Sequence, residues 1–211
     1  MKYGVLLIET GVPEDDSPEA LRHYVDVVLG TGLYADKLGF VQSRLFRHVT
    51  IPAKRRDWRR YFYGAGTDVA STYLRHAKSL RDKLAGRLVE ATRRQGIVTV
   101  GMRCGSPSLD EAASALMQEG CSTIVLLPLY PLRFPPMTVP ALDEARAAIE
   151  RVGKGAWTPQ VIEIDSFCRT PGFAQALATR IGRDWKPRNV SRLLILMPSE
   201  PRSLARDDGT Y

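Results

Sequence analysis

The chain reads IVTVGMRCGSPSL from Ile97 to Leu109 and IVLLPLYP from Ile124 to Pro131. Each stretch starts as a short apolar run and ends in glycine, proline and polar residues, which is typical of a buried strand followed by a turn. Five such runs occur along the chain, and they are Gly4–Glu9, Ile97–Met102, Thr123–Pro128, Gln160–Ile164 and Arg192–Met197. Helical patterns separate them, and strands that alternate with helices indicate a parallel sheet. We therefore expect an α/β fold, a Rossmann-like parallel sheet of about five strands flanked by helices on both faces.

Helix-start signals precede the apolar stripes that lie between these runs. Ser17-Pro18 offers an N-cap and a first-turn proline, and Thr170-Pro171 repeats that pattern closer to the end of the chain. Ser108 and Glu111 form a capping box ahead of a helix that should end near Gly120. These signals predict helices in the places where a parallel sheet needs its crossover connections.

The composition suits one compact domain over residues 1–211. With 44% hydrophobic residues, the chain can bury a substantial core. No run of about 18 apolar residues is present, and Met1 leads straight into an apolar strand, so we expect a cytoplasmic protein without a membrane span or secretory leader. Cys104, Cys121 and Cys168 are scattered, which argues against a disulfide framework, a structural zinc site and an iron–sulfur cluster.

The net charge of +7 favours acidic partners. The densest basic run is Lys54–Tyr61, KRRDWRRY, in which Trp58 and Tyr61 alternate with cations. Three interpretations remain open: a solvated helix face, a basic rim that attracts carboxylated small molecules or anionic lipid, and a nucleic-acid surface. Nucleic acid is the least expected of the three, because no recognised binding motif accompanies the run.

Polar and turn-forming residues follow the first and second predicted strands. Thr10, Gly11 and Pro13 come directly after the first, without the glycine pattern of a Rossmann site or the lysine of a Walker A loop. Met102 and Arg103 end the second. Arg103 can pair with a carboxylate or phosphate of a ligand, or with a neighbouring acid of the protein, and Met102 offers a soft apolar surface. The adjacent Cys104 is expected to be a small buried residue.

The third predicted strand ends in Tyr130 and Pro131, within a proline-rich segment. Prolines make a rigid, non-helical wall, and Tyr130 can pack against an aromatic ligand or in the core. In open α/β sheets, ligands bind outside the carboxyl ends of the strands. Three successive strand ends of this kind therefore predict one binding crevice, which both Met102 and Arg103 should face.

The order of these motifs resembles the N-terminal half of ferrochelatases. The matching segments are Gly4–Leu7 with Gly11-Val12-Pro13, Gly101-Met102-Arg103 with Gly105–Leu109, Pro128–Pro131, and Asp143-Glu144. The resemblance covers almost the whole chain and implies a chelatase-type fold whose strand ends form a porphyrin cleft between two similar halves. It implies ferrous iron insertion into porphyrin, a step of haem biosynthesis, with iron and porphyrin as substrates and no resident cofactor. The porphyrin-binding positions that it implies are Thr10, Gly11, Pro13, Ser71, Met102, Arg103, Tyr130 and Pro131.

The sequence departs from the family pattern at three places. Glu9 stands where the family has asparagine, and Ser71 is the residue kept from a Gly-Gly-Ser-Pro-Leu segment. Pro198-Ser199-Glu200-Pro201 stands where the family has His-Gly-x-Pro, whose histidine handles pyrrole protons. Proline cannot act as a base, so Glu9 and Glu200 are the candidates for that role, and the metal site stays unknown.

Several functions follow as hypotheses. The chain is a chelatase completed by a homodimer or by a separate C-terminal-half chain, or a non-catalytic tetrapyrrole-binding or regulatory protein, a pseudoenzyme that kept the cleft. The third hypothesis is an interaction module that uses Lys54–Arg60, with peripheral membrane contact as one outcome. A truncated or decayed gene product is the fourth.

Overall fold

The computed structural model describes residues 2–29, 49, 51–64, 69–93, 96–154, 158–185, 192 and 194. The chain forms two compact units, of which the first is Met1–Leu129 with Phe134–Asp165 and the second is Tyr130–Arg133 with Ser166–Tyr211. The first unit holds the sheet. The second holds helix α7, Pro171–Trp185.

Four parallel strands form the sheet of the first unit. They are β1 (Tyr3–Gly11), β2 (Gly96–Cys104), β3 (Thr123–Pro128) and β4 (Gln160–Glu163), and their order across the sheet is β2-β1-β3-β4. The predicted parallel α/β fold is thus confirmed, with four described strands instead of about five. The predicted strand over 192–197 lies outside the described residues except for Arg192 and Leu194, which carry no strand.

Strand β1 is the centre of the core. It pairs with β2 on one side and β3 on the other, so that Leu7 lies opposite both Val100 and Leu127. Leu6, Leu7 and Ile8 have no exposed surface. Their burial on both faces explains why this strand is an unbroken apolar run and not an alternating one.

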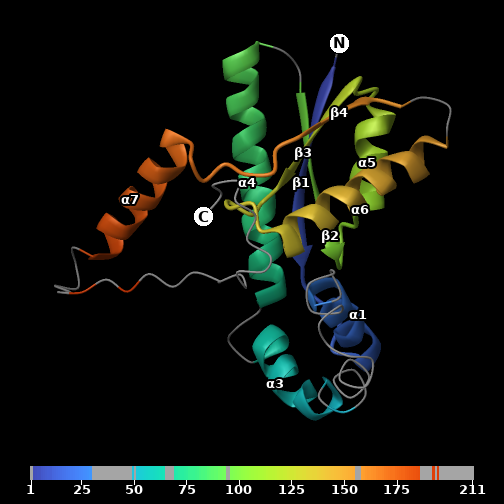
Figure 1. Ribbon diagram of the computed structural model, residues 1–211, viewed down its shortest axis with the longest axis vertical. Coiled ribbons are helices and arrows are strands. Elements are labelled where there is room, and N and C mark those ends of the chain that lie inside the picture. Colours follow the sequence, from blue (N-terminus) through green and yellow to red (C-terminus); the bar gives the residue numbers. More distant parts are fainter. Residues whose placement is uncertain are drawn as a thin grey trace. The chain divides into compact units, whose positions relative to one another are not determined.

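Helices cover both faces of the sheet, as the sequence predicts (Figure 1). Helix α4 (Val69–Thr92) lies on one face, against β2 and β1. Helices α5 (Leu109–Gln118) and α6 (Pro135–Gly153) lie on the other face and pack on each other. None of the described helices combines the length and the hydropathy that a membrane crossing requires.

Both predicted N-caps of the first unit are present. The side chain of Ser108 accepts from the backbone N–H of Glu111, and Glu111 accepts from the backbone N–H of Ser108, which completes the capping box of α5. Ser17 Oγ accepts from the backbone N–H of Ala20 at 3.1 Å, at the start of α1 (Pro18–Leu29).

The basic run lies on α3 (Ile51–Tyr63). The ring of Trp58 packs edge-on against Tyr24 of α1, with centroids 5.9 Å apart, and so turns toward the protein. Arg59 donates from Nε to Oδ2 of Asp16 at 2.7 Å, and Arg60 is exposed. Tyr61 of the same run is 64% exposed, so one of its two aromatic rings is packed and the other is accessible. The solvated helix face and a binding surface for an acidic partner therefore both remain compatible with this helix.

Candidate functional site at the strand ends

The carboxyl ends of β1 and β2 are paired and joined by a backbone hydrogen bond. Glu9 lies opposite Met102 and Gly11 lies opposite Cys104, and the backbone N–H of Val12 donates to the carbonyl of Cys104 at 3.1 Å. Gly11 has φ +81°, and a Cβ on it would lie 1.8 Å from the carbonyl oxygen of Cys104. Only glycine fits there, because any side chain would overlap the neighbouring backbone.

The turn after β2 repeats this close approach. Gly105 has φ +92°, and a Cβ there would lie 2.7 Å from the carbonyl oxygen of Val12. The backbone N–H of Met102 donates to the carbonyl of Pro107 at 2.7 Å, which folds the turn back onto the strand end. The two glycines therefore let the exits of β1 and β2 pack backbone against backbone at this edge of the sheet.

Glu9 carries the perturbed carboxyl group of this edge. It is half-buried at the end of β1, and Tyr73 of α4 donates its hydroxyl proton to the Glu9 carboxylate. Burial raises the pKa of the Glu9 carboxyl above 4.5, while the hydrogen bonds from Tyr73 and from the backbone of Thr10 act in the opposite direction. A carboxyl of this kind can exchange a proton closer to neutral pH than an exposed one.

Arg103 is bound by an acid of the protein. Its Nε donates to Oε2 of Glu144 at 2.8 Å and its Nη2 donates to Oε1 at 2.6 Å, which makes a two-pronged pair between β2 and α6. The Arg103 side chain has no exposed surface. Of the two predicted roles for Arg103, the structure contains the pairing with a neighbouring acid. The role of Glu144 was missed, although Asp143-Glu144 belongs to the motifs that carry the family resemblance.

Met102 and Arg103 point to opposite faces of the sheet, as adjacent strand residues do. Met102 is 3% exposed and packs with Val5 and Leu7 on the α4 face, whereas Arg103 meets Glu144 of α6. These two side chains therefore do not line one common space, which corrects the expectation that both face the same crevice.

The remaining predicted residues of the first unit surround the end of β1. Thr10 is half-buried, and Pro13 is buried, with its carbonyl accepting from the hydroxyl of Tyr63 at 2.5 Å. Ser71 lies on α4, two residues before Tyr73. The hydrogen bonds of Tyr63 and Tyr73 thus hold α3 and α4 against the exit of β1.

Tyr130 and Pro131 belong to the second unit. The carbonyl of Pro131 accepts from the backbone N–H of Phe167 at 3.1 Å, from that of Cys168 at 2.9 Å and from Ser166 Oγ at 3.2 Å. This carbonyl anchors the segment that leads into α7. Tyr130 is half-buried.

Two further candidates, Pro198 and Glu200, lie outside the described residues. Among the residues that are described, no group of three or more His, Cys, Asp or Glu side chains is placed to hold a metal ion. Cys104 is buried, and burial raises the pKa of its thiol to about 11, so it stays protonated at neutral pH. This placement confirms the expectation of a buried residue.

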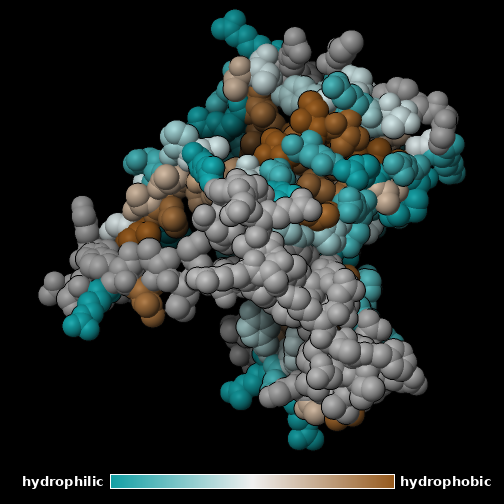
Figure 2. Space-filling model, in the orientation of Figure 1, coloured by the Kyte–Doolittle hydropathy of each residue, from teal (hydrophilic) through white to brown (hydrophobic). Residues whose placement is uncertain are grey.

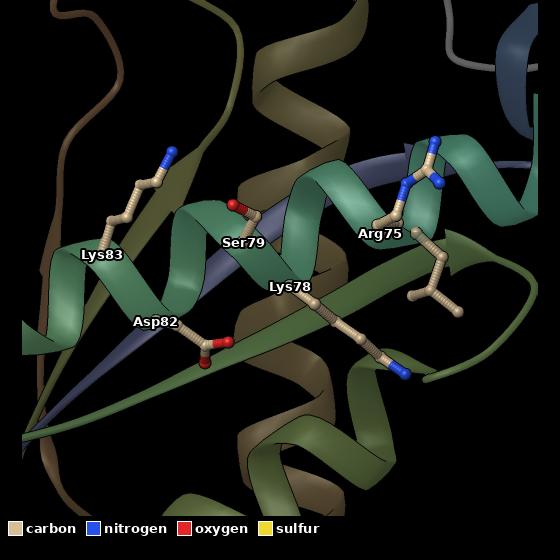
Figure 3. A pocket seen from close by; sticks show the side chains of 6 residues that line it. Arg75, Lys78, Ser79, Asp82 and Lys83 are labelled. Atoms are coloured by element: carbon tan, nitrogen blue, oxygen red, sulfur yellow. The ribbon is translucent and has the colours of Figure 1, made fainter.

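A separate hollow of about 580 Å³ lies along α4. Its lining residues are Leu74, Arg75, Lys78, Ser79, Asp82 and Lys83. Figure 3 shows Lys78 and Asp82 leaving the helix on one side and Arg75, Ser79 and Lys83 on the other. Lys78 therefore lies apart from Arg75 and Lys83, and the three cations do not surround one point where an anion could be held.

Comparison with known proteins shows the family to which this chain belongs. A protein-family model described as Ferrochelatase matches residues 2–211. The chain is 27% identical over 209 residues to a ferrochelatase of Chromobacterium violaceum, which covers 99% of this chain and 56% of that protein. It is 29% identical over 180 residues to a ferrochelatase of Edwardsiella ictaluri, covering 85% of this chain and 54% of that protein. For a ferrochelatase of Vibrio cholerae the identity is 26% over 194 residues, with coverage of 92% and 58%. The chain spans somewhat more than half the length of these relatives.

Proposed function

Because this chain belongs to the ferrochelatase family, we propose that it binds a porphyrin at the carboxyl ends of β1 and β2 and inserts ferrous iron into it. The observation that carries this proposal is Glu9, a half-buried carboxyl with a raised pKa at the end of the central strand. Family membership supports a porphyrin as the ligand, and Glu9 supports the removal of protons from the pyrrole nitrogens.

Metal insertion needs a base beside the macrocycle. Two pyrrole N–H protons must leave as the divalent ion enters. The two positive charges of the departing protons are thereby replaced by the two of the metal ion. Glu9 accepts one proton from a pyrrole nitrogen, whose lone pair then binds the metal, and passes that proton to water before the second transfer. The hydroxyl of Tyr73 holds the carboxylate in position between transfers.

The strand ends form a rigid edge, and ligands of open α/β sheets bind at such an edge. Gly11 and Gly105 let the turns after β1 and β2 pack against each other, and Pro13 is fixed by the hydroxyl of Tyr63. Arg103 is held by Glu144, so the carboxylates of a porphyrin are expected to be recognised by other cations of this basic chain.

A second candidate function is porphyrin binding without chemistry. The sequence Pro198-Ser199-Glu200-Pro201 favours it, because proline stands where the family resemblance implies the proton-handling histidine. In that case the protein carries a tetrapyrrole or regulates its supply, and Glu9 has no effect on metal insertion.

The two candidates separate in one experiment on the full chain. Porphyrin is titrated into the protein and its main absorbance band is followed, and ferrous iron is then added without oxygen. We expect a band shift with micromolar porphyrin in the unaltered protein and in Glu9→Gln, and a rate of insertion at least about tenfold lower in Glu9→Gln.

The matched control is Glu150→Gln, which changes an exposed carboxylate of α6. It should leave both binding and rate unchanged. An absence of any band shift would contradict porphyrin binding, and a shift without insertion above the protein-free rate would select the carrier. Equal rates in Glu9→Gln and the unaltered protein would contradict the role of Glu9.

A further inference from the structure

The loop between β1 and α1 is held at both of its ends. It comprises residues 12–17, and we call it the β1–α1 loop. At its start, the backbone N–H of Val12 donates to the carbonyl of Cys104 at 3.1 Å, which ties the loop to the end of β2. At its finish, Ser17 caps α1 by accepting from the backbone N–H of Ala20 at 3.1 Å. The middle of the loop is contacted by α3.

Helix α3 reaches the β1–α1 loop through two side chains. The hydroxyl of Tyr63 donates to the carbonyl of Pro13 at 2.5 Å, and Nε of Arg59 donates to Oδ2 of Asp16 at 2.7 Å. Arg59 and Tyr63 are four positions apart, so they lie on the same side of the helix, one turn from each other. This spacing lets α3 bind two separate points of the loop at once.

The adjacent side of α3 packs on α1, the helix into which the loop leads. Trp58 and Phe62 are also four positions apart, and each precedes one of the two loop-binding residues, so this side lies about 100° around the helix. Both rings pack edge-on against Tyr24 of α1, with centroids 5.9 and 5.1 Å apart. Phe62 is 3% exposed. One helix therefore holds both the loop and the helix that follows it.

The outer side of α3 carries cations. Arg56 and Arg60 are exposed, and Figure 2 shows hydrophilic side chains at the end of the molecule where α3 lies in Figure 1. A helix of this amphipathic kind is stabilised by the packing of its inner side more than by its own propensity. The position of α3 and the position of the β1–α1 loop therefore depend on each other.

The two contacts with the loop differ in strength. Pro13 is buried and Tyr63 is half-buried, so a loss of the hydroxyl would leave the Pro13 carbonyl without this donor where water has little access. The side chains of Arg59 and Asp16 are 68% and 38% exposed. An exposed ion pair contributes little and is screened by salt. Tyr63 is therefore the main contact, and Arg59 is a weaker one that depends on salt.

We propose that α3 is a clamp on the porphyrin site, in which Tyr63 and, more weakly, Arg59 are positioning residues that set the affinity for porphyrin. This inference rests on the proposed function, because the family resemblance implies that Gly11 and Pro13, at the start of the clamped segment, bind porphyrin. The clamp acts through Pro13 and Asp16 and touches no reacting atom.

The proposed base is held by other elements. Glu9 lies opposite Met102 in the sheet and accepts from the hydroxyl of Tyr73 on α4. A loosened β1–α1 loop should therefore displace the binding surface and leave the base in place. The two tyrosines thus have separate roles, since Tyr63 affects the affinity for porphyrin and Tyr73 affects the pKa of Glu9.

Hydrogen exchange of the full chain without a ligand tests the clamp. Tyr63→Phe keeps the ring and removes the hydroxyl, and it should raise the exchange rates of the Val12 and Ser17 amides at least about fivefold. The amide of Glu111, in the capping box of α5, should keep its rate, which excludes a general loss of folding. The matched control is Tyr61→Phe, on the same helix and 64% exposed, which should change none of these rates. Unchanged exchange at Val12 and Ser17 in Tyr63→Phe would overturn the clamp.

Porphyrin titration and iron insertion test the positioning. In Tyr63→Phe the dissociation constant for porphyrin should rise about fivefold. The rate at saturating porphyrin and its pH dependence should stay as in the unaltered protein, whereas a general structural defect would lower the rate as well. Tyr61→Phe should change neither quantity. An unchanged dissociation constant in Tyr63→Phe, or a shifted pH profile, would overturn the positioning role. If the protein binds porphyrin without inserting iron, the dissociation constants decide alone.

Salt tests the weaker contact. At low salt Arg59→Gln should raise the dissociation constant about twofold over the unaltered protein, and this ratio should return to one at about 1 M salt. Arg59→Lys keeps the cation and should bind as the unaltered protein does. A ratio that is independent of salt would overturn the role of Arg59. An unaltered protein that binds no porphyrin contradicts the proposed function and the effect of the clamp on affinity, while the exchange rates still decide whether α3 holds the loop.

Discussion

Arg103 and Glu144 join the end of β2 to α6 through two hydrogen bonds of 2.8 and 2.6 Å. The guanidinium is fully buried, while the Glu144 side chain is 41% exposed. The arginine at the strand end therefore recognises a carboxylate of its own chain. This pair places the strand end and fixes α6 against it, which is a structural role beside the proposed porphyrin surface.

The asymmetry of this pair predicts unequal costs for its two partners. Glu144→Ala removes the carboxylate from a buried cation and should lower the free energy of unfolding by about 2–4 kcal/mol. Arg103→Met leaves the Glu144 carboxylate where water can reach it. Losing the ion pair in this variant should therefore lower the free energy of unfolding by about 1 kcal/mol or less. The double variant should be more stable than Glu144→Ala alone. Urea unfolding of the three variants measures this order, and a lower stability of Arg103→Met than of Glu144→Ala would contradict it.

Gly11 should not tolerate a side chain. A Cβ there would meet the Cys104 carbonyl oxygen at 1.8 Å, and φ is +81°. Gly11→Ala should therefore cost at least about 2 kcal/mol of stability, since both strain and overlap must be relieved. The control is Gly86→Ala on α4, where nothing lies within 4 Å of a new Cβ and a gain of about 0.5–1 kcal/mol is expected. Thermal unfolding of both variants compares them, and equal shifts of the two would contradict the geometry.

The raised pKa of Glu9 predicts a pH-dependent effect of Glu9→Gln on stability. Burial favours the protonated carboxyl, so this contribution to stability is fully present below the unfolded pKa, about 4.3, and is lost as the pH rises through the folded pKa. Glutamine cannot ionise, and it still accepts from Tyr73. The stability of Glu9→Gln relative to the unaltered protein should therefore increase with pH above about 4.3. Denaturant titrations at several pH values measure it, and a difference that falls with rising pH would show the opposite sign.

Tyr73→Phe should raise the pKa of Glu9 further. The hydroxyl of Tyr73 donates to the carboxylate and thereby lowers the pKa that burial raises, so its removal leaves burial with less opposition. Carbon-13 chemical shifts of the Glu9 carboxyl against pH report the value directly. Tyr3→Phe is the control, because Tyr3 is 3.0 Å from Thr92 Oγ1 at the other end of α4. A lower Glu9 pKa in Tyr73→Phe would contradict the assigned direction.

The sequence predicted the strands and the helix starts, which depend on local patterns. Apolar runs located β1 to β4, and Ser108 with Glu111 located the start of α5, because strand burial and helix capping depend on neighbours along the chain. The partner of Arg103 was not predictable from residue type, since Glu144 is 41 positions away and ligand and protein carboxylates are equivalent in chemistry. The link between Tyr73 and Glu9 was missed for the same reason, across 64 positions. Ile162 and Ile164 lie in a run that the sequence predicts to be covered on both faces, and their side chains are 43% and 38% exposed, because an apolar run does not reveal how fully each of its side chains is covered.

The most direct test of the proposed function is the rate of ferrous iron insertion into porphyrin as a function of pH. If Glu9 is the base, the rate should increase as the pH rises through the folded pKa of Glu9, which lies above 4.5. This increase should disappear in Glu9→Gln and move to higher pH in Tyr73→Phe. A pH profile that is the same in all three proteins would contradict the assignment of Glu9 as the proton acceptor.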